Sequence, residues 1–212
     1  MKPLNRHGHS FSRHWFGSTS ELIFRDETQV PSIVLLGCPD HAMLPYCLPV
    51  SNPNSFLVAQ HLGFAISHFA DPPDVATLEL LDEVIHGYEV TDFIICSHTN
   101  CLISRQGLAS EADSNLTPYC DVIKPTLQFI QHKYPDAFEM EIYGLFLREH
   151  ILLQLENLIE YASIKSRLED GRLKIHGWLF DEGSRRLRAF DPLEGEFVSV
   201  DANASVSPID EE

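Results

Sequence analysis

Short, uninterrupted apolar runs alternate with amphipathic stretches through the first half of the chain. Ile33–Gly37 and Phe93–Cys96 are apolar over the length of a strand, with no polar alternation. Such runs are typical of strands that are buried on both faces, as in a parallel sheet. Apolar residues at helical spacing predict a helix at about 55–69 and a second one from Asp74 to Gly87. Asp74 suits the N-cap of the second helix and Gly87 its C-terminal end. This alternation predicts an α/β fold whose central, mainly parallel sheet has helical crossovers.

The second half of the chain predicts helices followed by a strand pair. A helix is expected at about 121–133, and a longer one opens at Asp136 and Glu139, which have capping-box spacing, and ends at Asp170–Gly171. Residues 173–180 and 188–200 then alternate between apolar and polar, as in a late hairpin or an edge-strand pair. We expect a single domain at residues 21–200, an N-terminal arm at 1–20 and an acidic tail at 201–212.

Composition and charge narrow the class of protein. The chain has 212 residues, 44% of them hydrophobic and 10% aromatic, which are values of a globular protein. A formal charge of −16 disfavours nucleic acid and anionic membranes as partners. No apolar run approaches the roughly 20 residues of a membrane span. Five cysteines, two of them in ligand-like spacing, fit a reducing compartment better than a disulfide framework, so we expect a cytoplasmic protein.

Metal-ligand residue types stand where the two apolar runs end. Cys38 follows the first run, and His98 and Cys101 follow the second in the spacing H-x-x-C. Ligands of open parallel sheets collect beyond the carboxyl ends of the strands, so these side chains are expected to converge. Two thiolates and an imidazole are three ligands for Zn²⁺, and a zinc ion without a fourth protein ligand can hold a water molecule.

With Asp40 added, these residues form the pair Cys38-x-Asp40 and His98-x-x-Cys101, which resembles the β-class carbonic anhydrases. That family has a C-x-D-S-R motif after one strand and an H-x-x-C motif after another. The resemblance extends over about residues 21–200 through three further features: Gln29-x-Pro31, the turn Ser51–Asn54, and the closing helix and strand at 154–158 and 171–178. It implies one Zn²⁺, carbon dioxide and bicarbonate as substrates, and a homodimer or higher homo-oligomer.

The resemblance also assigns roles to two further residues. Gln29 would donate an amide hydrogen to carbon dioxide or bicarbonate. Asp40 has two possible roles: it accepts a hydrogen bond from zinc-bound water as a catalytic residue, or it is itself the fourth zinc ligand. In the family an arginine pairs with this aspartate, and Ala42 stands in its place here. An unpaired carboxylate in a semi-buried pocket is costly, so without the arginine we expect Asp40 to bind the zinc itself.

These departures leave more than one function open. The family reaction is the reversible hydration of carbon dioxide to bicarbonate by zinc-bound hydroxide, and here its activity is expected to be weak or lost. A catalytically silent, zinc-stabilised binding or scaffold subunit is the alternative. A third hypothesis is a hydrolase of a related linear substrate.

Overall fold

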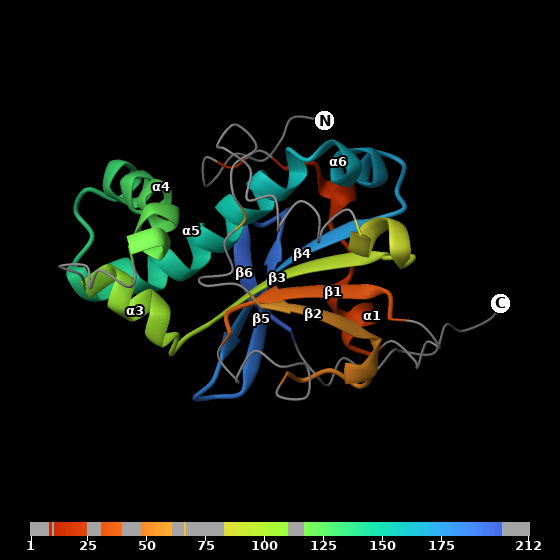
Figure 1. The fold of residues 1–212 in the computed structure, drawn as a ribbon. Helices are drawn as coiled ribbons and strands as arrows, with labels where there is room; N and C mark the ends of the chain where they lie inside the picture. Colours follow the sequence, from red (N-terminus) through yellow and green to blue (C-terminus); the bar gives the residue numbers. More distant parts are fainter. Residues whose placement is uncertain are drawn as a thin grey trace.

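A six-stranded mixed sheet forms the centre of the molecule in the computed structural model (Figure 1), which describes residues 9, 11–24, 31–39, 48–60, 66, 83–109 and 117–200. The strand order is β2-β1-β3-β4-β5-β6. The strands are β1 (Ile33–Gly37), β2 (Phe56–Gln60), β3 (Asp92–His98), β4 (Lys174–Asp181), β5 (Arg186–Asp191) and β6 (Glu196–Ser199). β2, β1, β3 and β4 run parallel, and β5 and β6 are antiparallel to their neighbours. The predicted α/β fold with a mainly parallel sheet is therefore confirmed.

The two apolar runs form the buried centre of this sheet. Every residue of β1 and β3 is buried, as expected for strands covered on both faces. They pair in parallel, with Ile33 opposite Asp92 and Leu36 opposite Ile95. Because parallel strands end at the same edge of a sheet, the segment after β1 lies beside the end of β3.

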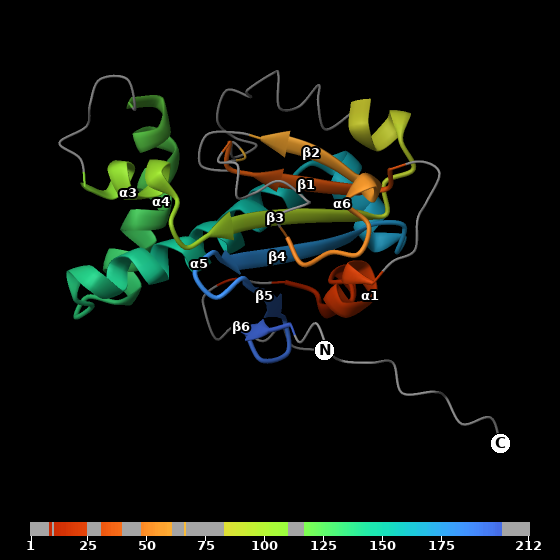
Figure 2. The ribbon, with the colours of Figure 1, turned by 90° about the horizontal axis from the view of Figure 1, so that it is seen from below.

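Helices cover the sheet and extend beyond its carboxyl edge. They are α1 (Thr19–Ile23), α3 (Leu102–Ala109), α4 (Thr117–Lys133), α5 (Glu139–Ile159) and α6 (Ala162–Glu169), with 3₁₀ turns η1 (Arg13–Trp15) and η4 (Pro53–Ser55). α5 packs on β3 and β4, while α3 and α4 gather beyond the arrowheads of the parallel strands (Figure 2). Gly177 of β4 permits this close packing, because an added Cβ would lie 2.9 Å from Ile151 Cγ2 of α5. Across the described part of the chain, no helix is long and apolar enough to cross a membrane.

Several elements differ from those predicted. The helix expected at about 55–69 is wrong at its start, because residues 56–60 form β2, paired in parallel with β1. The described part of the next predicted helix, residues 83–87, is helical. The long helix begins at Glu139, where Glu141 Oε2 accepts a hydrogen bond from the Phe138 N–H at 3.0 Å, and it is interrupted between α5 and α6.

The late strand pair is also placed differently from the prediction. β4 and β5 do form a hairpin, but β4 lies inside the sheet with β3 on its other side. The second predicted strand is divided into β5 and β6 by a turn that contains Gly195 at φ 70°. The strand at this edge of the sheet is therefore β6, and β2 is at the other edge. The acidic tail at 201–212 lies outside the described residues.

The described part of the N-terminal arm packs on its own chain. Phe16 forms a β-bridge with Ile175 of β4. Gly17 allows the close approach, because an added Cβ would lie 2.7 Å from Cε1 of His176. His9, which is 5% exposed, has its Nε2 2.9 Å from Glu149 and its Nδ1 3.0 Å from Glu156, both on α5.

This buried histidine is held between two carboxylates. Burial lowers the pKa of His9, but the hydrogen bonds and charges of Glu149 and Glu156 outweigh burial and raise it. Burial raises the pKa of Glu149, but hydrogen bonds from His9 and Tyr134 and the charge of Lys133 outweigh burial and lower it. These contacts favour the imidazolium form of His9, whose two ring nitrogens connect the N-terminal segment to α5.

The stability that this contact provides should depend on pH. The contribution of His9 is complete below its ordinary pKa of 6.5 and is lost as pH rises through the raised value. The contribution of Glu149 is complete above its ordinary pKa of 4.5 and is lost as pH falls through the lowered value. We expect His9→Gln to lower the free energy of unfolding by about 1.5–3 kcal/mol at pH 5.5 and by less at pH 9, in urea unfolding. The exposed His86→Gln is the control, and equal losses at both pH values would show that His9 acts by packing alone.

Candidate metal centre

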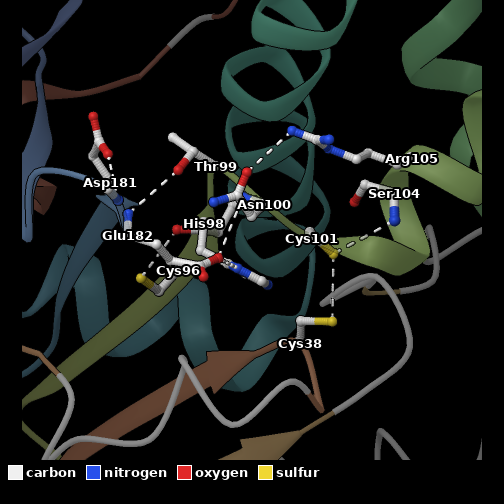
Figure 3. Close-up of polar contacts among 12 residues, drawn as sticks. Cys38, Cys96, His98, Thr99, Asn100, Cys101, Ser104, Arg105, Asp181 and Glu182 are labelled. Atoms are coloured by element: carbon white, nitrogen blue, oxygen red, sulfur yellow. Dashed lines mark hydrogen bonds and ion pairs between the residues drawn. The ribbon is translucent and has the colours of Figure 1, made fainter.

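Three potential ligands meet where β1 and β3 end. Cys38 lies one residue beyond β1, His98 is the last residue of β3, and Cys101 directly precedes α3. Their ligand atoms all lie within 4.8 Å of one another, and the Sγ atoms of Cys38 and Cys101 are 3.5 Å apart (Figure 3). All three side chains are fully buried. The structure thus brings together the three residues that the strand-end argument selected.

The position of Cys101 at the start of α3 favours its thiolate form. The Ser104 N–H, in the first turn of α3, donates to Cys101 Sγ at 3.4 Å. The hydrogen bond with Cys38 is the main cause of a lowered pKa of Cys101, and His98 and Ser104 lower it further against the effect of burial. The thiolate is the form that binds metals, so this environment prepares Cys101 as a ligand.

His98 is oriented by a carboxylate from another strand. Its Nδ1 donates a hydrogen bond to Oε1 of Glu182, which follows β4. The other ring nitrogen, Nε2, then lies on the side of the two cysteine sulfur atoms. Figure 3 places the imidazole between Glu182 and the cysteine pair. Burial lowers the pKa of His98, but its hydrogen bonds with Cys101 and Glu182 outweigh burial and raise it.

Glu182 was not predicted from the sequence as a site residue, because it lies in a stretch with the composition of a turn, Asp181–Ser184. It is 84 residues from His98 along the chain. The pairing of β3 with β4 brings the two together: Thr99 N–H donates to Phe180 O at 3.0 Å, and Glu182 N–H donates to Thr99 Oγ1 at 3.3 Å. The sequence did contain one indication of this role: Glu182 is a carboxylate just after a predicted strand, and that strand, β4, pairs with β3.

The other predicted site residues lie outside the part of the chain that the structure describes. These are Asp40 and Gln29, and Ala42, which stands in place of the family arginine, is outside it as well. Whether Asp40 binds the metal or accepts a hydrogen bond from bound water therefore stays a prediction. The role of Gln29 toward the substrate stays one too.

The three converging donors fit zinc. Thiolate and imidazole are the ligand types of Zn²⁺ sites, and three protein ligands with an open fourth position are typical of catalytic ones. The lowered pKa of Cys101 and the hydrogen bond on Nδ1 of His98 supply the protonation states that such binding needs.

Comparison with known proteins agrees with this geometry. The family profile described as carbonic anhydrase matches residues 33–186. Carbonic anhydrase 1 of Escherichia coli O157:H7 is 25% identical over 206 residues, covering 94% of this chain and 92% of that protein. A carbonic anhydrase of Pseudomonas aeruginosa is 24% identical over 207 residues, covering 94% and 91%.

Solved structures show the same fold. The β-carbonic anhydrase CcaA superposes with a TM-score of 0.70 at 21% identity, over 80% of this chain and 84% of that one. Tetrameric β-carbonic anhydrases of Sordaria macrospora give a TM-score of 0.62 at 18% identity, over 76% and 81%. The profile match spans well over half of the chain and includes Cys38, His98 and Cys101. This chain therefore belongs to the β-carbonic anhydrase family, whose reaction is the reversible hydration of carbon dioxide to bicarbonate.

Proposed function

We propose that the protein is a zinc-dependent carbonic anhydrase in which Cys38, His98 and Cys101 hold the metal. One observation supports this most directly: two thiols and an imidazole converge, fully buried, at the edge of the sheet where β1 and β3 end. Carbon dioxide and bicarbonate are the proposed substrates. When bound, zinc supplies a Lewis acid that lowers the pKa of a coordinated water molecule.

The charges of the ligands limit how far the zinc can lower the pKa of a bound water molecule. Two thiolates cancel the +2 charge of zinc, whereas an all-histidine site keeps it. The centre therefore acidifies water less, and the surrounding groups decide how active it is. The carboxylate of Glu182 adds a further negative charge on the outer side of His98. This arrangement favours retention of the metal over activation of water.

We also propose that Asp40 occupies the fourth zinc position in the resting protein. The support is in the sequence: Ala42 replaces the arginine that would pair with this carboxylate. Without that charge-assisted pair, nothing in the motif opposes the attraction between the carboxylate and the metal. Hydration activity near neutral pH should then be low, which keeps a zinc-stabilised, catalytically silent subunit as the second candidate.

Two broader proposals concern assembly and compartment. We propose a homo-oligomer of at least two subunits, because a solved neighbour is described as tetrameric. We propose the cytoplasm as the compartment, because Cys38 and Cys101 must stay reduced to bind zinc.

Zinc binding should depend on the cysteine pair. We expect the purified protein to contain one Zn²⁺ per chain and Cys101→Ser to lose most of it, as measured by elemental analysis. The control is Cys96→Ala, because the Cys96 sulfur points away from Cys101 in Figure 3 and bonds Ser97 O. Chelation should also lower the melting temperature of the wild type, since the metal joins strands that are distant in sequence. Equal zinc in all three proteins would refute the ligand assignment.

Restoring the arginine should raise catalysis. In stopped-flow hydration of carbon dioxide at neutral pH, we expect zinc-replete Ala42→Arg to exceed the wild type by about tenfold or more, the effect of one charge-assisted hydrogen bond. Ala162→Arg, an exposed position at the start of α6, adds the same charge elsewhere and should leave the rate unchanged. High turnover in the wild type would contradict a closed centre.

The mass in solution should exceed that of one chain. We expect static light scattering at micromolar concentration to give at least twice the monomer mass of 24.0 kDa. A mass of one chain over the whole concentration range would contradict the proposed assembly.

A further inference from the structure

We propose that Glu182 is a positioning residue for the metal: it fixes the tautomer and ring orientation of His98 and strengthens this imidazole as a ligand. The inference rests on the zinc-binding function proposed above and assigns a role to a residue outside the three-ligand cluster. Its consequence is a centre that retains metal more tightly than its two thiolates and imidazole would alone.

The first step is the hydrogen-bond chemistry of the imidazole. A neutral imidazole has one N–H, and the nitrogen that carries it cannot bind a metal. The carboxylate of Glu182 accepts only, so it requires the proton to be on Nδ1 of His98. Nε2 then presents its lone pair on the side of the cysteine pair. In the neutral ring, the contact therefore selects the tautomer whose Nε2 can bind a metal.

The second step is that Glu182 is itself held in place. Its Oε1 also accepts a hydrogen bond from the Asn100 N–H at 3.3 Å, within the loop that joins His98 to Cys101. Its own N–H donates to Thr99 Oγ1. A single carboxylate oxygen thus connects the imidazole to the backbone between the two ligands, so that His98 and Cys101 are positioned together.

Neighbouring side chains make both ends of this connection rigid. On the Glu182 side, Asp181 Oδ1 accepts hydrogen bonds from the Gly183 and Ser184 N–H groups at 2.9 and 3.1 Å, which orders the β4–β5 turn. On the other side, Arg105 donates to Asn100 Oδ1 at 3.0 Å and lies over the ring of Tyr143, 5.2 Å from its centroid. Figure 3 shows the Arg105, Asn100 and Glu182 side chains above and beside the cluster.

The third step is electrostatic. The carboxylate draws the Nδ1 proton toward itself, which makes Nε2 a better electron donor to a metal. Because the two ligand thiolates already cancel the charge of Zn²⁺, the carboxylate of Glu182 adds its negative charge on the outer side of His98, where it favours a bound cation.

Two variants test the role of this carboxylate. Glu182→Ala removes the acceptor, and we expect it to weaken zinc binding by about 10–100-fold in competition with a chromogenic chelator. Glu182→Gln keeps a carbonyl oxygen in place but removes the charge, so its loss should be smaller. Both should shift the visible absorption bands of the Co²⁺-substituted protein, which report ligand geometry. Glu169→Gln, an exposed change at the end of α6, is the control and should match the wild type.

The possible outcomes separate this inference from the proposed function. Zinc affinities within twofold of the wild type and unchanged Co²⁺ spectra in both Glu182 variants would overturn the positioning role and leave the zinc-dependent function intact. A wild-type protein that binds no zinc would overturn both. If the alanine variant does not fold, the isosteric glutamine variant carries the test through its Co²⁺ spectrum and its chelator affinity.

Discussion

The close approach of two buried sulfur atoms is the constraint on which the rest of this site depends. Cys38 and Cys101 place their Sγ atoms 3.5 Å apart with no solvent exposure. Two thiolates at that distance repel each other strongly in a medium of low dielectric constant, so both can ionise only with a cation between them. A divalent metal ion satisfies this requirement, because it neutralises the two buried thiolates. It also links the ends of two strands.

The fold supplies the geometry that the cluster needs. Parallel pairing of β1 and β3 fixes their ends side by side, and β4 brings Glu182 to the same edge. Gly177 lets α5 pack directly on β4, the strand that Glu182 follows. The site thus lies at three strand ends: His98 is the last residue of β3, and Cys38, Cys101 and Glu182 lie in the segments that follow β1, β3 and β4.

The pattern of apolar residues within each segment predicts part of this arrangement. The rest depends on contacts between segments that are distant in the sequence. Cys38, His98 and Cys101 could be placed because each follows a buried run, and the ends of parallel strands meet by geometry alone. Residues 56–60 could not be assigned reliably, because a short run such as Phe-Leu-Val-Ala-Gln suits either a helix or an edge strand until its pairing with β1 is known. Glu182 and His9 escaped prediction for the same reason: their partners lie 84 and 140 residues away.

The most direct test of the account is zinc K-edge X-ray absorption on the purified, zinc-loaded protein, because it reads the metal's own ligands. We expect two sulfur atoms at about 2.3 Å and one imidazole nitrogen at about 2.0–2.1 Å. A fourth ligand should be a carboxylate oxygen at about 2.0–2.2 Å, as proposed for Asp40. A zinc shell of nitrogen and oxygen alone, without sulfur, would contradict the central claim that Cys38 and Cys101 hold the metal.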